Sequence, residues 1–295
     1  MIDMHIHTCN SDGSSSVKQV LEEANRLSLN IISITDHNSV AAYDELSNPD
    51  IRKIFCGEIV TGCEITTTYM GEVIEVLGYD FDLITMRELL NQNVLTFEQK
   101  QLEEFELIKK RYKEIEIKFN AENIRFDPKK ESCRAAFCGE IKRYPENYSF
   151  FLEQSSIDSK SGFTRNEVYN PKSPLYVDES PLYLSLESAI AIIHEAGGLA
   201  FLAHTFAYSP TIFKELESIM GNYEFDGAEC YYTTFTDEQI MYLLDFCNKH
   251  QLYKSGGSDF HGTNKVNHNM GIGAGNMKIE ENLITDWHRV SEKLD

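Results

Sequence analysis

The chain has 295 residues, and 42% of them are hydrophobic, so it can bury a substantial core and is neither disordered nor fibrous. Its 27 Lys and Arg residues are outnumbered by 47 Asp and Glu residues, which gives a net charge of −20. A protein this acidic repels nucleic-acid backbones and anionic membranes, so we expect neither a long nucleic acid nor a membrane as a partner.

The cysteines and the N-terminus indicate a cytoplasmic protein. The seven cysteines include no C-x-x-C pair, which is typical of reduced, mostly buried thiols. The first residues lack the basic and apolar regions of a secretory signal, and no apolar run approaches the ~18 residues that cross a membrane.

Strands alternate with helices at the start of the chain, which predicts a parallel α/β sheet or barrel. We expect strands over residues 1–6, 30–34, 55–65 and 72–79, and helices over 17–29 and 39–46. The alternation returns late in the chain, with strands over 199–203, 226–231 and 252–256 and helices over 186–196 and 236–250. Gly197 and Gly198 end the first of these helices, as glycines do at helix C-termini.

The middle of the chain has a different character. Residues 83–183 are polar, charged and mostly helical in pattern, with a long amphipathic helix over 98–118 and a Ser-, Asn- and Pro-rich loop over 155–181. We therefore interpret residues 1–82 and 184–295 as a barrel into which a mostly helical cap subdomain, residues 83–183, is inserted.

Residues able to bind metal follow nearly every predicted strand, where barrel enzymes place their active sites. They are His5, His7, His37, Glu64, Glu75, His204, Asp259 and His261, with Asp12 in the loop after the first strand. Taken singly, each has an ordinary structural explanation: His5 and His7 could be a surface pair, His37 a neighbour of a helix N-cap, and His204 a core histidine. Their recurrence at successive strand ends favours one metal centre, and the mixture of imidazole and carboxylate suits Zn, Mn or Fe better than Ca.

The sequence resembles the PHP family, named for polymerase and histidinol phosphatase domains. The resemblance lies in the segments DMHIHT (3–8), SDG (11–13), ITDH (34–37), GCE (62–64), LGY (77–79), GGLAFLAH (197–204) and GGSDFHG (256–262). It implies a distorted seven-stranded (β/α) barrel that holds two or three divalent ions. The implied ligands are His5, His7, Glu64 and Asp259 for one ion, Glu64, Glu75 and His204 for a second, and Asp12, His37 and His261 for a third.

Two details of the motifs bear on chemistry. The SDG form around Asp12 resembles the branch of the family that cleaves nucleotides or short oligonucleotides. Relatives often carry histidine at the position of Glu75, so a carboxylate there either favours Mn or Fe(II) over Zn or leaves that site weak. Three divalent ions would outweigh the four ligand carboxylates by about two positive charges and so attract an anionic substrate.

We therefore expect an enzyme that hydrolyses phosphate esters, either a phosphatase or a phosphodiesterase, on a small nucleotide or short oligonucleotide. A hydroxide that bridges the metals is the expected nucleophile. The residues expected to be catalytic are Asp12, His37, Glu64, His204, Asp259 and His261. The alternatives are a histidinol-phosphatase-like or amidohydrolase-like hydrolase, or a metal-binding module without catalysis.

Several further side chains are candidates for the substrate pocket. Arg134 and Arg165 lie in the predicted cap and are candidate substrate contacts, with ordinary surface charge as the alternative, and surface charge is the favoured interpretation of Lys172. Tyr231 and Tyr232 follow a predicted strand and either line the pocket or belong to the core.

Overall fold

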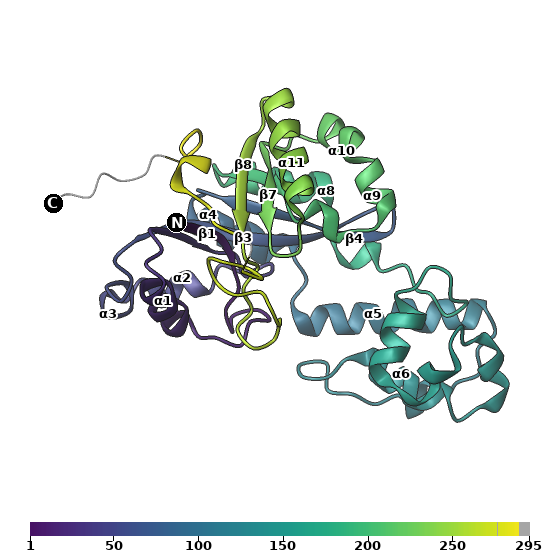
Figure 1. Cartoon of the computed structure of the whole chain (residues 1–295). Helices are drawn as coiled ribbons and strands as arrows, with labels where there is room; N and C mark the ends of the chain where they lie inside the picture. Colours follow the sequence, from purple (N-terminus) through teal and green to yellow (C-terminus); the bar gives the residue numbers. More distant parts are fainter. Residues whose placement is uncertain (276, 289–295) are drawn as a thin grey trace. The chain divides into compact units, whose positions relative to one another are not determined.

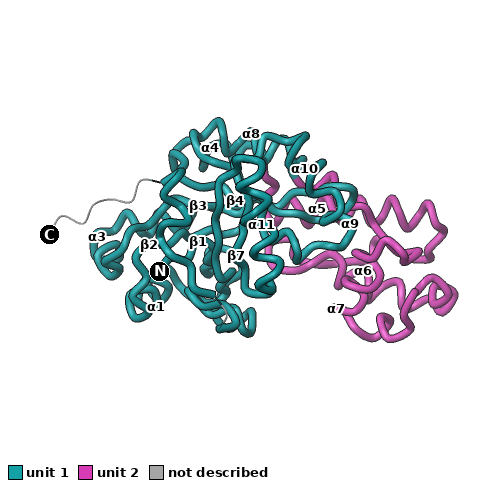
Figure 2. The backbone as a smooth tube through the Cα atoms, turned by 45° about the horizontal axis from the view of Figure 1, so that its top comes forward, with its two compact units in different colours: residues 1–93, 184–295 teal, residues 94–183 magenta. Residues whose placement is uncertain are grey.

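The computed structural model describes residues 1–275 and 277–288. The chain divides into two compact units: unit 1 is Met1–Asn93 with Leu184–Asp295, and unit 2 is Val94–Tyr183 (Figure 2). The helix Leu83–Asn93 (α4), which we had expected in the inserted segment, belongs to unit 1. It does so because it buries Met86 and Leu90 and packs against the helix Leu186–Glu195 (α8) of the same unit.

Unit 1 is built on one sheet whose strands run in the order β1-β2-β3-β4-β6-β7-β8. These strands are Ile2–Ile6 (β1), Ile31–Ile34 (β2), Glu58–Tyr69 (β3), Glu72–Tyr79 (β4), Leu199–Leu202 (β6), Gly227–Tyr232 (β7) and Tyr253–Gly257 (β8), and Leu184–Ser185 (β5) pairs with β3. The first and last strands approach each other. Just beyond their ends, the His7 amide donates to the Phe260 carbonyl at 2.8 Å. The seven strands therefore form a nearly closed barrel.

The sheet is not wholly parallel, in contrast to the simplest expectation from the sequence. β4 runs antiparallel to both β3 and β6. Its direction follows from the tight connection to β3, in which Met70 and Gly71 have φ angles of 52° and 79°. Positive φ at both central residues is the geometry of a two-residue hairpin turn, which joins antiparallel neighbours only.

Helices flank this sheet (Figure 1). Besides α4 and α8, they are Val17–Arg26 (α1), Ala42–Leu46 (α2), Pro49–Arg52 (α3), Pro210–Lys214 (α9), Leu216–Asn222 (α10) and Asp237–His250 (α11). The core of the barrel includes Ile2 and Met4 of β1. The pairing of β1 with β2 shifts register between Asp3 and Ile6, so strict alternation of side chains does not hold there. His5 and His7 both approach Glu64, whose partner on β4, Leu77, belongs to this core.

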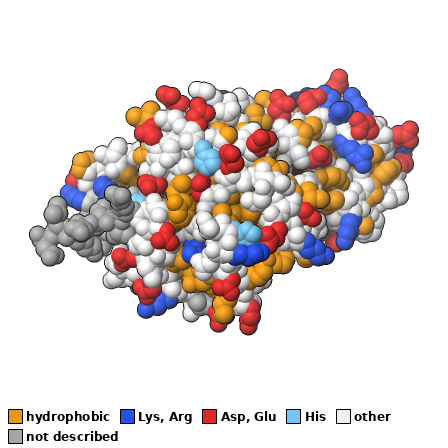
Figure 3. Space-filling view, turned by 90° about the horizontal axis from the view of Figure 1, so that it is seen from above, with side chains coloured by type: hydrophobic (Ala, Val, Ile, Leu, Met, Phe, Trp, Pro, Cys, Tyr) orange, Lys and Arg blue, Asp and Glu red, His pale blue; other side chains and the backbone are white. Residues whose placement is uncertain are grey.

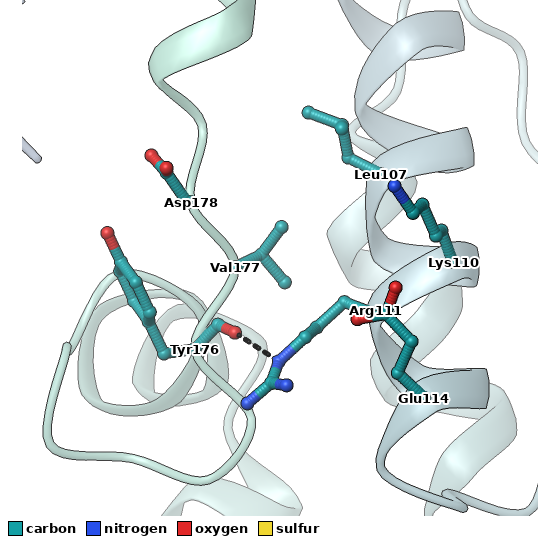
Figure 4. Close-up of a pocket in the computed structure, with 7 residues that line it drawn as sticks. All are labelled: Leu107, Lys110, Arg111, Glu114, Tyr176, Val177 and Asp178. Carbon is teal, nitrogen blue, oxygen red and sulfur yellow. Dashed lines mark hydrogen bonds between the residues drawn. The ribbon is translucent and has the colours of Figure 1, made fainter.

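Unit 2 has a hydrophobic core of its own, which includes Ile108, Tyr112, Phe137 and Phe163. Its helices are Phe97–Glu114 (α5), Cys133–Ile141 (α6) and Lys160–Gly162 (α7), with short helical turns over Gln154–Asp158, Phe163–Val168 and Ser180–Leu182 in the segment expected to be loop. A groove of about 340 Å³ separates α5 from residues 176–178 (Figure 4). Arg111 crosses it and donates to the Tyr176 carbonyl at 3.2 Å, which ties the two segments together.

Acidic side chains are scattered over the face in Figure 3 with basic and histidine side chains between them. Among the residues that the structure describes, no helix combines the length and the hydropathy of a membrane span.

Candidate metal centre

The barrel brings all nine predicted ligands into one cluster. The contributing segments are the end of β1, the loops after β1, β2, β6 and β8, and the paired strands β3 and β4. Three overlapping groups of donor atoms lie within the reach of a metal ion: His7, Asp12, His37 and His261; His5, His7 and Glu64; and His37, Glu64 and Glu75.

The deepest group surrounds His5 of β1 and His7, which follows the end of that strand. The Nε2 atoms of His5 and His7 lie 3.0 Å apart. Glu64 Oε2 lies 3.3 Å from His5 Nε2 and 3.2 Å from His7 Nε2. Asp259 Oδ1 lies 3.5 Å from the first of these nitrogens and 3.3 Å from the second. Two imidazoles and two carboxylates that converge in this way form a donor set suited to a transition-metal ion.

Glu64 also belongs to a second group. Its Oε1 atom lies 3.0 Å from His204 Nε2, and Glu75 Oε2 lies 3.1 Å from the same nitrogen. His37 Nδ1 lies 3.3 Å from Glu64 Oε2 and 3.4 Å from Glu75 Oε1. The structure thus places His37 beside this group as well as beside Asp12. Glu64, whose two oxygens face different histidines, is positioned to serve two ions.

The third group is the most open to solvent. Asp12 Oδ1 lies 3.0 Å from His261 Nε2, 3.6 Å from His7 Nδ1 and 3.7 Å from His37 Nε2. The Asp12 side chain is 54% exposed, whereas that of Glu64 is 1% exposed. Asp12 therefore marks the side of the centre that faces solvent within unit 1.

The protein alone leaves several donors of this cluster unsatisfied. His7 Nδ1 and His204 Nδ1 are buried and have no hydrogen-bond partner in the described part of the chain. His37 Nδ1 and His261 Nε2 are also buried, and although carboxylate oxygens lie 3.0–3.4 Å away, the geometry there is not that of a hydrogen bond. Buried polar atoms normally have partners, so a concentration of such atoms indicates a missing group. The donor set fits divalent metal ions.

The electrostatics explain how this cluster of charges stays buried. Burial opposes the charged form of His7, but hydrogen bonds to Asp259 and Glu64 outweigh it and raise the pKa of His7 to about 9. Burial is likewise outweighed at His204, whose pKa the Glu64 and Glu75 carboxylates raise to about 10. Burial would raise the pKa of Glu64, yet the surrounding histidines hold it well below its ordinary value.

A buried glutamate on β7 completes the centre and was not identified from the sequence. Glu229 Oε1 lies 2.9 Å from His5 Nδ1, and Glu229 Oε2 accepts from the His204 amide at 2.8 Å. Such a partner fixes the orientation of a ligand imidazole. A single glutamate in an otherwise apolar strand was the available signal.

Two more side chains reach Asp259 from outside the predicted ligand set. Tyr232 donates to Asp259 Oδ2 at 2.8 Å, so this tyrosine borders the centre. Lys265 Nζ donates to the same oxygen at 2.7 Å. Lys265 follows the last motif and matches no segment of the resemblance, so sequence reasoning passed over it.

Both predicted substrate contacts lie in unit 2. Arg134 Nε lies 3.1 Å from Glu104 Oε1, and Arg134 Nη1 lies 3.4 Å from Glu179 Oε1. The Arg134 side chain is 14% exposed, so its guanidinium is largely engaged within the unit. Arg165 is exposed in the turn Phe163–Val168. A role for either arginine in substrate binding stays a prediction.

Residues 3–203 match the PHP domain family model. The chain is 27% identical over 263 residues to a 5'-3' exoribonuclease of Haemophilus influenzae, which covers 88% of this chain and 89% of the relative. It is 26% identical to 5'-3' exoribonuclease Rnm of Escherichia coli, with 88% of this chain and 84% of the relative covered. It is 23% identical to a 3',5'-nucleoside bisphosphate phosphatase of Chromobacterium violaceum, with 88% of this chain and 87% of the relative covered.

Solved structures show the same fold. A proposed metal-dependent phosphoesterase from Bifidobacterium adolescentis aligns with a TM-score of 0.61 at 20% identity, covering 97% of this chain and 94% of its own. An amidohydrolase from Chromobacterium violaceum, solved with bound sulfate and no metal, aligns with a TM-score of 0.59 at 21% identity, covering 88% and 87%. With its barrel and its cluster of metal ligands, the chain belongs to the PHP domain family and is a metal-dependent phosphoesterase.

Proposed function

We propose that this enzyme hydrolyses the ester bond on the 3' side of a 5'-phosphorylated nucleoside, and that its main substrates are short oligoribonucleotides degraded from the 5' end. A 5'-3' exoribonuclease and a 3',5'-bisphosphate phosphatase, the activities named for its relatives, both break that bond. They differ only in whether the phosphorus attacked by water also carries a further nucleotide, since the 3' oxygen of the 5'-phosphorylated nucleoside leaves in both. Seven of the nine predicted ligands form the overlapping donor groups, and Asp259 and His204 contact members of these groups. This convergence supports catalysis over a non-catalytic metal-binding role.

The geometry suggests how the candidate ligands are distributed among the metal ions. His5, His7, Glu64 and Asp259 would hold one ion, Glu64, Glu75 and His204 a second, and Asp12, His37 and His261 a third. Bound divalent ions would supply the positive charge that offsets the phosphoryl oxygens and would activate water for attack. We expect two or three ions, with Glu75 favouring Mn or Fe(II) over Zn.

Hydrogen bonds from residues behind the candidate ligands hold this arrangement in place. Asp36 Oδ1 accepts from the Thr8 amide at 2.7 Å and from the Ser11 hydroxyl at 2.6 Å, and so fixes the loop that carries Asp12. Glu229 fixes the ring of His5. Such supports keep ligands in place and raise the affinity of a metal centre.

The two units differ in charge. Unit 2 holds 15 Lys and Arg residues against 16 Asp and Glu residues, a net charge of −1, whereas the rest of the chain holds 12 against 31, a net charge of −19. Four acidic residues of unit 2 are buried: Glu104, Glu140, Glu167 and Glu179. Its solvent-facing charge is therefore more basic than its total. Of the two arginines predicted to contact substrate, Arg165 is the exposed one.

The decisive experiment compares three substrates after the protein is reconstituted with Mn²⁺, Fe²⁺ or Zn²⁺: a 5'-phosphorylated RNA trimer, adenosine 3',5'-bisphosphate and histidinol phosphate. We expect 5'-mononucleotides from the trimer and phosphate from the bisphosphate. The Asp259→Asn variant is the control for contaminating nucleases and should release neither. Turnover of histidinol phosphate alone, or no turnover in a metal-loaded protein, would contradict the proposal.

A further inference from the structure

We propose that Lys265 is a further catalytic residue, whose ammonium group contacts a non-bridging phosphoryl oxygen of the substrate. Lys265 lies outside every motif of the PHP resemblance. Its proposed role rests on the proposed function above and is supported by its position beside Asp259, its contacts and its positive charge.

Lys265 lies directly behind one metal ligand. Its Nζ atom is 2.7 Å from Asp259 Oδ2, while the other oxygen, Asp259 Oδ1, faces the imidazoles of His5, His7 and His261 at 3.2–3.5 Å. One carboxylate group therefore separates the ammonium from the ring nitrogens of the deepest donor group. The Lys265 side chain is 39% exposed, so the ammonium also reaches solvent.

The backbone on the N-terminal side of Lys265 is fastened to the loop that carries Asp12. The Thr263 amide donates to the Ser14 hydroxyl at 2.7 Å, and the Asn264 side chain donates to the Asp12 carbonyl at 2.8 Å. Gly262 permits this approach, since it has a φ of +64° and a Cβ there would lie 2.1 Å from Ser14 Oγ. Lys265 is therefore placed at the open side of the centre by the same contacts that support Asp12.

The charge of Lys265 does not serve metal binding. A fixed cation beside a site for divalent cations repels them, so it lowers metal affinity. Asp259 Oδ2 does not depend on it either, because Tyr232 already donates to that oxygen at 2.8 Å without adding charge. A positive charge at this place is favourable for an anion that arrives after the metals.

The ammonium has the capacity for such a contact. Of its three N–H donors, one is used by Asp259, and the other two have no partner within residues 1–275 and 277–288. Phosphoester hydrolysis places additional negative charge on the non-bridging oxygens in the transition state, and a lysine donor that meets them stabilises it. Lys265 makes no covalent bond in this role and transfers no proton.

The test uses Lys265→Met, Lys265→Arg and a matched control, Lys278→Met, which removes a 74% exposed lysine of unit 1. Three quantities are measured on the full chain: Mn²⁺ affinity, the affinity of the Mn²⁺-loaded protein for inorganic phosphate, and kcat/KM on the best substrate. In Lys265→Met we expect Mn²⁺ affinity to be equal or higher, and phosphate affinity and kcat/KM to fall about 10- to 100-fold. Lys265→Arg should retain part of both, and Lys278→Met should match the wild type.

The change in Mn²⁺ affinity distinguishes a substrate contact by Lys265 from a role in positioning Asp259. If Lys265→Met binds Mn²⁺ more weakly, Lys265 acts by positioning Asp259 and the proposed substrate contact is wrong. If phosphate affinity and kcat/KM are both unchanged, the residue has no role in the reaction. Weaker phosphate binding by Lys265→Met supports the contact even if the protein cleaves none of the nucleotides tested, so failure of the proposed function can be recognised separately.

Discussion

Metal binding to this protein should displace protons and should therefore tighten as the pH rises above neutral. In the metal-free protein, neighbouring carboxylates raise the pKa of His7 to about 9 and that of His204 to about 10. Both imidazoles are then protonated near pH ~7 and must lose a proton before they can bind a metal. For His7, the raised pKa makes this cost a few kcal/mol near pH ~7, on the order of 1.4 kcal/mol per pKa unit.

The expected slope follows from the number of protons displaced. Each displaced proton raises the apparent affinity of the ion that displaces it about tenfold per pH unit. His7 and His204 belong to the candidate sites of different ions, so each site should gain about tenfold per unit between pH ~7 and ~8. Glu64 contributes none of these protons, because the surrounding histidines hold its pKa well below the ordinary value and it is already ionised.

Calorimetric titration with Mn²⁺ in two buffers of different protonation enthalpy measures the number of protons released, and competition with a chelating dye measures the affinity across pH. His250→Gln is a matched control, because His250 pairs with Glu217 away from the centre. An affinity that stays constant with pH, with no proton released, would show that the histidines are neutral before metal arrives and would refute the reasoning.

The same shifts predict how the stability of the metal-free protein depends on pH. A histidine with a raised folded-state pKa stabilises the fold fully below its unfolded value of ~6.5, and this contribution is lost as the pH rises through the folded-state pKa. For His7 and His204 the loss falls between pH ~6.5 and about 10. The thermal midpoint of the metal-free protein should therefore fall over this window, and Mn²⁺ should restore it.

Three further predictions follow from single contacts. Glu64→Gln and Asp259→Asn should each abolish turnover and weaken Mn²⁺ binding, since each removes an anion shared by several imidazoles. Circular dichroism should show an intact fold in both variants. Near-normal kcat in either variant would contradict the assignment. Arg134→Ala should lower the free energy of unfolding by about 2 kcal/mol, because Glu104 and Glu179 lose their ion pairs while Lys100 still offsets part of their charge. An unchanged unfolding midpoint would show that the ion pairs are not needed. Gly262→Ala should reduce kcat/KM at saturating Mn²⁺, because its Cβ would displace the Ser14 hydroxyl; wild-type kinetics would show that the loop adapts.

The residues predicted to bind metal lie together in the structure, whereas the residues that support them could not be predicted from the sequence. His5, His7 and Asp259 could be predicted because strand-end histidines and aspartates stand out against apolar strands, and strand ends meet on one rim of a barrel. Glu229 was missed because its role depends on two partners far away in the chain, His5 and His204. Lys265 was missed for the same reason, since its path depends on contacts between two loops that no local pattern encodes.

The fold was predicted in its class but not in each connection. Alternating strands and helices indicated a barrel, yet β4 runs antiparallel because a two-residue turn at Met70 and Gly71 joins it to β3. That signal was present in the short polar break between the two strands, although one sequence offers no register to confirm it. The helix Leu83–Asn93 shows a different limit: its exposed side is polar, and only two buried residues, Met86 and Leu90, attach it to the barrel.

The raised histidine pKa values also explain how a cluster of buried carboxylates can fold before any metal arrives. Buried anions without counter-charges would destabilise the barrel by several kcal/mol each. In the metal-free protein, protonated histidines of the cluster supply these counter-charges, because the carboxylates around His5, His7 and His204 raise their pKa values. Protons thus occupy the role that metals take later, and folding does not have to wait for metal. The same exchange makes metal loading a precondition for substrate, because ions that carry two charges each turn an acidic cluster into an anion site.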